Sequence, residues 1–256
     1  MKFIILGCGS SLGVPRTDGY FGSCDPNNKK NYRTRCSALI KTSKENILID
    51  TSPDLRQQML NQNIKKIDKV LYSHMHADQT HGINDLRSFY IKNKKQVNVF
   101  ADPITSKYLK KNFSYCFNNY IKEYPPILKL NNSNKNLFVK NLNKNIKINP
   151  IKVQHGKVHS ICYIIDKKLA YISDVSEIFK KDFKYFKNLK YLIIDCLWYR
   201  NHPSHFNLEK SLEMIKIFSP KKAILTNLHT DIDYNRIKKI LPRNVIPAYD
   251  GLSVNL

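Results

Sequence analysis

Short apolar runs alternate with polar turns along most of the chain, and this pattern predicts a protein rich in buried strands. Ile161–Ile165 and Lys168–Ile172 resemble the two strands of a hairpin. Residues 120–150 hold short apolar runs between Asn/Lys stretches, so we expect strands and turns there rather than a linker. The other predicted strands are residues 2–7, Ser37–Thr42, Asn46–Asp50, Lys69–Ser73, Val97–Ala101, Tyr191–Asp195 and Ala223–Thr226.

Helices are predicted between these strands. Leu208–Phe218 repeats apolar residues at the spacing of one helix face. Pro53–Asn61 is predicted to be a helix with Ser52 as its cap, and further helices are expected over Thr80–Phe89 and from Pro103 onward. We therefore expect the whole 256-residue chain to form one domain, built of two sheets with flanking helices.

The chain is strongly basic, with a formal net charge of +23. A basic surface can attract phosphate-bearing partners over long range. The alternative is a Lys-rich composition throughout, as AT-rich coding produces. It fits better, because Lys is spread along the chain and no compact Arg-rich patch stands out. Nucleic acid is therefore the less favoured partner, whereas a small anionic substrate suits the charge.

The six cysteines form no C-x-x-C pair, and Met1 leads directly into the first predicted strand without a secretory signal. We expect reduced thiols in a cytoplasmic protein. No apolar run reaches the length of a membrane span, so no membrane partner is expected.

The strongest chemical signal is the run His74-x-His76-x-Asp78, which directly follows a predicted strand. A chain that leaves a strand edge can point alternate side chains in the same direction. Two imidazoles and a carboxylate placed in this way can bind a cation such as zinc, which prefers nitrogen, oxygen and sulfur ligands. A polar surface loop is the alternative, and the presence of a further histidine at His81 makes it less favoured.

Further ligand candidates follow later strands, namely His155, Asp174 and His229. A lone His or Asp after a strand is more often a turn residue or a helix cap. The repetition of one arrangement, a strand followed by a ligand, favours a shared metal site.

The order of these residues resembles that of the metallo-β-lactamase superfamily. Gly7–Pro15, Lys30–Ser37, Ile49–Asp54 and His81–Arg87 resemble its PhnP-like branch, the phosphoribosyl 1,2-cyclic phosphate phosphodiesterases. The resemblance spans nearly the whole chain. It implies an α/β (α+β) fold, a four-layer αββα sandwich of two mixed sheets flanked by helices, with metals at the rim of the sheets.

The resemblance also implies a role for each ligand candidate. The implied ligands are His74, His76 and His155 for a first divalent ion, Asp78 and His229 for a second, and Asp174 as the bridge between them. The ions are expected to be Zn²⁺ or Mn²⁺ and to share a hydroxide that attacks phosphorus, which makes Asp78 and Asp174 catalytic as well. The resemblance assigns His205 as the acid that protonates the departing oxygen.

Two positions depart from the family pattern. The superfamily usually has His after the aspartate of the first run, whereas this chain has Gln79, and a neutral amide oxygen is a poorer ligand for a transition metal. The second site is therefore expected to bind metal more weakly, to recruit water or to prefer a harder ion such as Mn²⁺. His81 is close by in the sequence, but its spacing from Asp78 is expected to direct its side chain away from the metal site. A cysteine-bound zinc in the early loop is not expected, because that loop keeps only Cys24, with Asp25 beside it.

Several other residues have a functional and a structural interpretation. Asp50 ends a predicted strand, where it can be a turn residue or, as we favour, can hydrogen-bond a metal-binding His. Arg33, Arg35 and Arg56 can clamp a phosphate, but they can equally be solvated or pair with local acids.

Together these residues predict a metal-dependent phosphodiesterase that acts on a small phosphate ester, for example phosphoribosyl 1,2-cyclic phosphate. A ribonuclease Z-like nuclease is an alternative, disfavoured because no long Gly/Pro-rich insertion resembles that family's tRNA-clamping arm. A metal-binding protein whose second site Gln79 has disabled is another, and a thioesterase or lactonase also stays open. The sequence is compatible with either a monomer or a homodimer.

Overall fold

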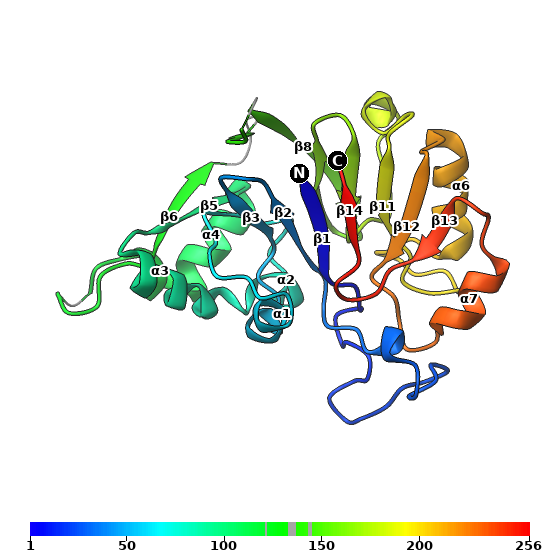
Figure 1. Cartoon of the computed structure of the whole chain (residues 1–256), viewed down its shortest axis with the longest axis horizontal. Helices are drawn as coiled ribbons and strands as arrows, with labels where there is room; N and C mark the ends of the chain where they lie inside the picture. The colour runs from blue at the N-terminus through cyan, green and yellow to red at the C-terminus, as the bar shows by residue number, and fades with distance from the viewer. Residues whose placement is uncertain (121, 133–136, 143–144) are drawn as a thin grey trace.

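The computed structural model describes residues 1–120, 122–132, 137–142 and 145–256, and its strands form two stacked sheets between two groups of helices (Figure 1). Helices α1 (Leu55–Asn61), α2 (Ala77–Thr80), α3 (Arg87–Asn93) and α4 (Pro103–Asn112) lie on the outer side of one sheet. Helices α6 (Leu208–Phe218) and α7 (Tyr234–Ile240) lie on the outer side of the other. This arrangement confirms the predicted four-layer sandwich of two mixed sheets.

Within the described residues, the first sheet has seven strands in the order β14-β1-β2-β3-β4-β5-β6. They are β14 (Ser253–Asn255), β1 (Lys2–Gly7), β2 (Ser37–Lys41), β3 (Asn46–Ile49), β4 (Lys69–Leu71), β5 (Val97–Ala101) and β6 (Leu128–Asn132). Neighbours from β14 to β3 run antiparallel, and neighbours from β3 to β6 run parallel. The chain therefore returns at its C-terminal end to pair with its first strand.

The second sheet, again within the described residues, has the order β13-β12-β11-β10-β9-β8-β7. Its strands are β13 (Val245–Pro247), β12 (Lys222–Thr226), β11 (Tyr191–Asp195), β10 (Leu169–Ile172), β9 (Val158–Ile165), β8 (Ile146–His155) and β7 (Leu137–Val139). β9 and β10 form the predicted hairpin. Its turn residues Asp166 and Lys167 have φ values of 49° and 52°, the left-handed conformation that a type I′ hairpin turn requires.

The helices and 3₁₀ turns cover the outer faces of the sheets. They are η1 (Lys29–Asn31), α1 (Leu55–Asn61), α2 (Ala77–Thr80), η2 (Ile83–Leu86), α3 (Arg87–Asn93), α4 (Pro103–Asn112), α5 (Ser114–Phe117), η3 (Lys180–Tyr185), α6 (Leu208–Phe218) and α7 (Tyr234–Ile240). The Asn207 side chain caps α6 by accepting from the Lys210 amide, and Asp102 caps α4 by accepting from the Thr105 amide.

The strands alternate their side chains between apolar layers, as the period of two in a pleated strand dictates. In β1, Ile4 packs under the helices of the first sheet while Ile5 faces the second sheet. In β11, Ile194 packs under α6 while Ile193 faces the first sheet. The two sheets and their helices thus enclose three buried apolar layers.

The helix predicted over Thr80–Phe89 is wrong as one continuous element, because the chain forms α2, η2 and α3 instead. Gly82 interrupts it. The Gly82 amide donates to the Thr51 carbonyl at 2.9 Å, and a Cβ at Gly82 would lie 1.9 Å from the Ser52 carbonyl oxygen. An amide that bonds another segment cannot continue the helical ladder.

Other predicted elements differ from the structure mainly at their ends. The helix expected from Pro53 begins at Leu55, and the Ser52 hydroxyl accepts from the Asp54 amide without capping the helix. β6, β7 and the start of β8 confirm strands within 120–150, where residues 121, 133–136 and 143–144 lie outside the described residues. α7, β13 and β14 were not predicted.

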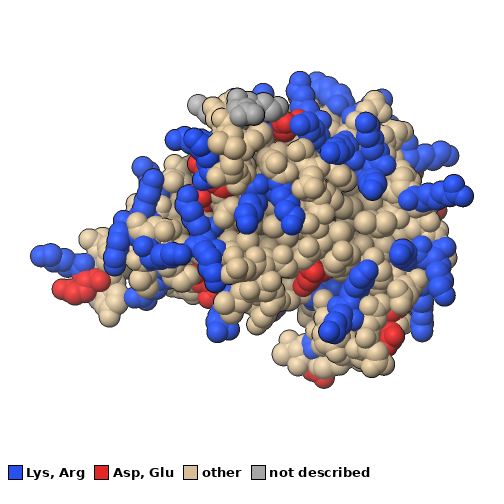
Figure 2. Space-filling model, viewed as in Figure 1, with Lys and Arg blue, Asp and Glu red and all other residues tan. Residues whose placement is uncertain are grey.

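Lysine and arginine side chains are scattered over the face seen in Figure 2, with few acidic side chains between them. On this face the basic side chains are spread out rather than gathered in one compact patch. Across the described part of the chain, no helix combines the length and the apolar character needed to cross a bilayer.

Candidate metal centre

Strand ends bring imidazoles and carboxylates together at one rim of the sheets. His74 and His76 lie between β4 and α2, His155 is the last residue of β8, and Asp174 follows β10. The side chains of His74, His155 and Asp174 are buried, and that of His76 is partly exposed. The predicted ligands of the first metal therefore come from separate segments that meet in the fold.

Three imidazole nitrogens converge on one point. The His74 Nε2 atom lies 2.9 Å from the His76 Nδ1 atom, and the His155 Nε2 atom lies 3.2 Å from the same His76 atom. Two nitrogens bound tetrahedrally to one zinc ion at its usual distance are about 3.3 Å apart. The spacing of the three imidazoles thus fits ligands of a single divalent cation.

The protonation of these imidazoles also suits a metal. The His155 Nδ1 atom donates to the Ser204 carbonyl oxygen at 2.6 Å, which leaves a lone pair on Nε2. Burial lowers the pKa of His74 to about 3 and also lowers the pKa of His76. Neutral imidazole is the form that binds metals.

Asp174 adds a negative charge beside the imidazoles. Ligand atoms of His155, Asp174 and His205 all lie within 4.8 Å of one another, as do those of His74, His76 and His155. Burial opposes ionisation of Asp174, but the nearby histidines, His74 first, lower the pKa of that carboxyl. Neutral imidazoles and an ionised carboxylate are a donor set that fits a divalent cation.

His205 is held by a carboxylate that the sequence analysis missed. Its Nδ1 atom lies 2.8 Å from the Oδ2 atom of Asp195, the fully buried last residue of β11. Burial opposes the imidazolium form, but Asp195 outweighs it and raises the pKa of His205 to about 9. Asn227, also missed, follows β12 and donates to Asp195 Oδ1 at 3.1 Å.

Asp195 and Asn227 share a signal that the sequence already contained. Each is a polar residue at the carboxyl end of an apolar strand, and β10, β11 and β12 run parallel. Parallel strands present their carboxyl ends at one edge of a sheet, where polar side chains gather. The same rule that pointed to Asp174 therefore applies to both residues.

Asp78 and Gln79 lie at the start of α2, next to Asp174. The Gln79 Nε2 atom donates to Asp78 Oδ2 at 3.1 Å and to Asp174 Oδ2 at 3.2 Å. Burial and the neighbouring Asp174 raise the pKa of Asp78 to about 6. The two carboxylates expected to serve a second ion are therefore close together and share an amide donor.

His229 is absent from both clusters of convergent ligand atoms among the described residues. Its Nδ1 atom lies 3.6 Å from Asp231 Oδ2, and its ring centroid lies 4.9 Å from that of Trp198. Asp231 and Trp198 are themselves joined by a hydrogen bond of 2.7 Å. The structure thus places His229 in a separate contact with these two residues.

Asp50 is fully buried behind the first histidine. Its Oδ1 atom accepts from the Ser73 amide at 2.7 Å, and the Ser73 hydroxyl lies 3.0 Å from His74 Nδ1. Ser73, rather than Asp50 itself, therefore contacts the imidazole.

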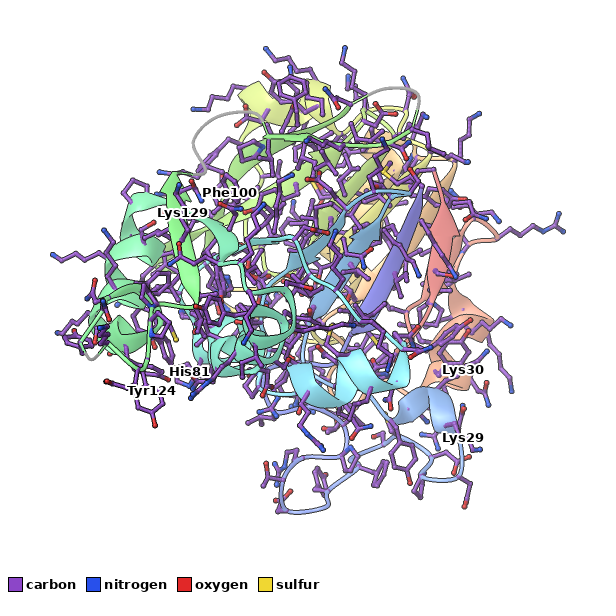
Figure 3. The ribbon with its side chains drawn as sticks, turned by 60° about the vertical axis from the view of Figure 1, so that its left-hand side comes forward. Lys29, Lys30, His81, Phe100, Tyr124 and Lys129 are labelled. Carbon is purple, nitrogen blue, oxygen red and sulfur yellow. The ribbon has the colours of Figure 1, made fainter. Side chains whose placement is uncertain are left out.

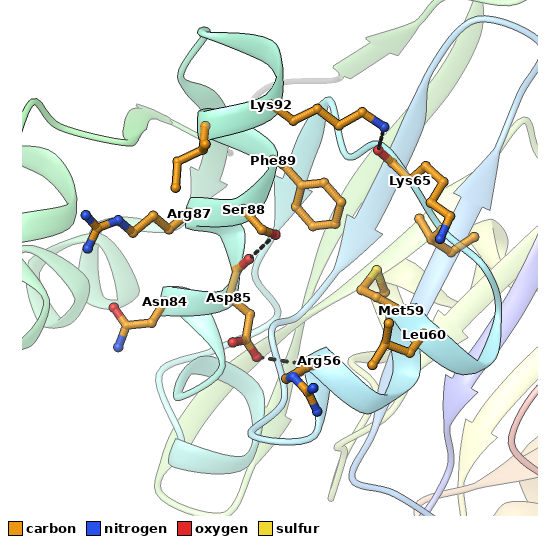
Figure 4. Close-up of a pocket in the computed structure, with 12 residues that line it drawn as sticks. Arg56, Met59, Leu60, Lys65, Asn84, Asp85, Arg87, Ser88, Phe89 and Lys92 are labelled. Atoms are coloured by element: carbon orange, nitrogen blue, oxygen red, sulfur yellow. Dashed lines mark hydrogen bonds between the residues drawn. The ribbon is translucent and has the colours of Figure 1, made fainter.

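The three arginines lie in different surroundings. Arg33 is buried and donates to Asn31 Oδ1 at 3.1 Å, whereas Arg35 forms a two-pronged ion pair with Asp54 at 2.7 and 2.6 Å. Arg56 lines a groove of about 560 Å³ between α1 and α3 (Figure 4). None of these contacts involves the histidine cluster.

His81 also lies away from the cluster. Its Nε2 atom is 3.0 Å from the Tyr108 hydroxyl, and its ring packs edge-on against Phe113, in the helical layer of the first sheet (Figure 3). This placement agrees with the expectation that the spacing of His81 directs its side chain away from the metal site.

Known proteins with related sequences or folds agree on one fold family. The family described as the beta-lactamase superfamily domain matches residues 45–227. A PhnP-family diphosphatase of known structure is 27% identical, with a TM-score of 0.86 over 100% of this chain and 97% of its own. Human tRNase Z, short form, is 12% identical, with a TM-score of 0.70 over 100% of this chain and 99% of its own.

One curated relative carries a name of a different kind. An octanoyltransferase of Porphyromonas gingivalis is 31% identical over 255 residues, which is 98% of this chain and 51% of that protein. The chain therefore spans about half the length of the curated relative that it matches.

Proposed function

The chain belongs to the metallo-β-lactamase superfamily of hydrolases, and from this premise we propose that it hydrolyses phosphate esters with the help of a bound divalent cation. The favoured reaction is cleavage of a phosphodiester in a small anionic substrate, such as phosphoribosyl 1,2-cyclic phosphate. The observation that carries the proposal is the convergence of the His74, His76 and His155 nitrogens beside Asp174, with His205 next to them.

In this proposal, His74, His76, His155 and Asp174 hold the cation. Such a cation, when bound, polarises the phosphoryl group and lowers the pKa of a nearby water. His205 donates a proton to the departing oxygen, for which its imidazolium form is suited. Asp195 keeps the His205 ring in place through the bond to Nδ1, so that Nε2 is the nitrogen that faces the substrate.

The choice of a phosphate substrate has two supports. The solved relative at 27% identity is a diphosphatase, so phosphate chemistry is known for a protein of similar sequence. The net charge of +23 also favours the approach of anionic substrates.

Two other activities are not preferred. The likeness to human tRNase Z, at 12% identity, concerns the fold, so it does not favour a tRNA substrate. The octanoyltransferase name belongs to a protein of about twice this length, and the candidate centre gathers metal ligands rather than an acyl-transfer nucleophile. We therefore propose neither activity for this chain.

Hydrolysis assays test the proposal directly. The purified chain, supplied with Zn²⁺ or Mn²⁺, is assayed on phosphoribosyl 1,2-cyclic phosphate, on bis(p-nitrophenyl) phosphate and on a precursor tRNA. We expect cation-dependent release of product from the first two substrates. Cleavage of the precursor tRNA alone would instead support the nuclease, and inactivity on all three substrates despite bound metal would refute the proposal.

A further inference from the structure

The part of the candidate centre where a second ion was expected contains a side-chain amide rather than a further metal ligand. Gln79 is fully buried, and its Nε2 atom lies 3.1 Å from Asp78 Oδ2 and 3.2 Å from Asp174 Oδ2. The NH₂ group of a glutamine has two hydrogens, one for each carboxylate. The amide thus occupies the space between the two carboxylates.

The orientation of this amide follows from the charges around it. Turning the amide over would point the Oε1 lone pairs at two carboxylate oxygens, which repel them. With Nε2 facing the carboxylates, Oε1 is left without a hydrogen-bond partner among the described residues. An amide nitrogen has no lone pair to offer a metal, so Gln79 in this orientation presents only donors to the place where a second cation would bind.

The imidazole expected to complete a second site, that of His229, is not among the convergent ligand atoms of the described residues. Its Nδ1 atom lies 3.6 Å from Asp231 Oδ2, and its ring lies beside that of Trp198. The side chain that reaches the centre from the end of β12 is Asn227, whose Nδ2 atom donates to Asp195. Between Asp78 and Asp174, a second cation would therefore meet the Gln79 amide donor where it needs a lone pair.

We infer that this chain binds one divalent cation, at His74, His76, His155 and Asp174, and that the Gln79 amide takes the place of a second by joining Asp78 to Asp174. The inference rests on the proposed function and narrows its metal requirement. In this arrangement Gln79, itself hydrogen-bonded to Asp78, positions Asp174 through a hydrogen bond, and neither Asp78 nor Gln79 binds metal. Proton donation by His205 then becomes more important, because no second cation stabilises the departing oxygen.

Metal counting tests the inference without relying on activity. The chain is loaded with excess Mn²⁺ or Zn²⁺, freed of loose metal by gel filtration, and measured by native mass spectrometry and elemental analysis. We expect one ion per folded chain, and for Mn²⁺ the electron paramagnetic resonance spectrum of an isolated ion. Two ions per chain would overturn the inference and leave the proposed function intact, whereas a chain that binds none would overturn both.

A substitution tests the role given to Gln79. Gln79→His replaces the donor by an imidazole with a lone pair, so we expect the count to rise to two ions and the manganese spectrum to show coupling between them. Gln57→His, on an exposed part of α1, is the matched control and should stay at one ion. A Gln79→His chain with an unchanged melting temperature and still one ion would overturn the role of the amide.

Discussion

The Nδ1 atom of His205 lies 2.8 Å from the Oδ2 atom of Asp195, a carboxylate with no exposed surface. The same carboxylate also accepts from the Val175 amide at 3.0 Å and from Asn227 Nδ2 at 3.1 Å. Backbone and side-chain donors therefore fix Asp195, and Asp195 fixes the imidazole. A histidine held in this way has one defined nitrogen, Nε2, for a substrate oxygen.

His205→Ala should reduce the turnover number by roughly 10²- to 10⁴-fold, the usual contribution of a general acid. Bound metal should stay unchanged, because the three convergent imidazoles come from other residues. His202→Ala is the control, since His202 contacts Ser204 and lies beside His205. We expect a smaller loss of turnover for His202→Ala. If His205→Ala instead loses bound metal in proportion to its loss of turnover, His205 belongs among the ligands.

Asp195→Asn should shift the pH dependence of turnover. Asp195 raises the pKa of His205, so its neutral replacement should lower that pKa, and the loss of activity caused by deprotonation of His205 should begin at lower pH. Steady-state rates across pH and the histidine NMR signals report this shift. A lower rate with an unmoved pH profile would mean that Asp195 is only structural.

The first histidine cluster could be foreseen because it follows a simple structural rule. Apolar strands are recognised from short runs of residues, and polar residues that follow parallel strands meet at one sheet edge. His74 and Asp174 follow strands with a parallel neighbour, whereas His155 ends β8, which pairs antiparallel with β7 and β9. The ligand atoms of all three are found in the two clusters of the centre.

Other features depend on contacts that no local pattern encodes. Gly82 breaks a helix because its backbone packs on Ser52, a residue thirty positions earlier in the chain. The direction of the Gln79 amide is set by Asp174, and the direction of His229 is set by Asp231 and Trp198. The sequence shows which of these side chains are near strand ends, but only the fold decides their orientation.

Removing the cation should lower the thermal stability of the chain. A ligand that binds only the folded state at a hundred times its dissociation constant stabilises that state by about 2.7 kcal/mol. Melting curves with Zn²⁺ and with a chelator should therefore differ by several degrees. His76→Ala should abolish the difference, and His159→Ala, which lies outside both clusters, should keep it. Identical curves with and without chelator for the unchanged chain would contradict a bound cation.

Asp54→Asn should destabilise the fold at neutral pH and have little effect in strong acid. Burial opposes ionisation of Asp54, but hydrogen bonds from Arg35 outweigh it and hold the pKa of that carboxyl below its usual value. A carboxylate with a lowered folded pKa contributes stability above its unfolded pKa of about 3.9, and this contribution is lost as the pH falls through the folded pKa. Because both side chains are partly exposed, we expect only about 1 kcal/mol.

Urea unfolding at neutral pH and at a pH well below the usual Asp pKa measures this effect as the difference between Asp54→Asn and the unchanged chain. Asp18→Asn is the matched control, because the Asp18–Arg16 pair is exposed on both sides and should change stability little at either pH. The difference caused by Asp54→Asn should shrink toward zero in acid, since protonated Asp54 no longer pairs as a charge with Arg35. A difference of constant size at both pH values would mean that the lost contribution is packing or neutral hydrogen bonding rather than the ion pair.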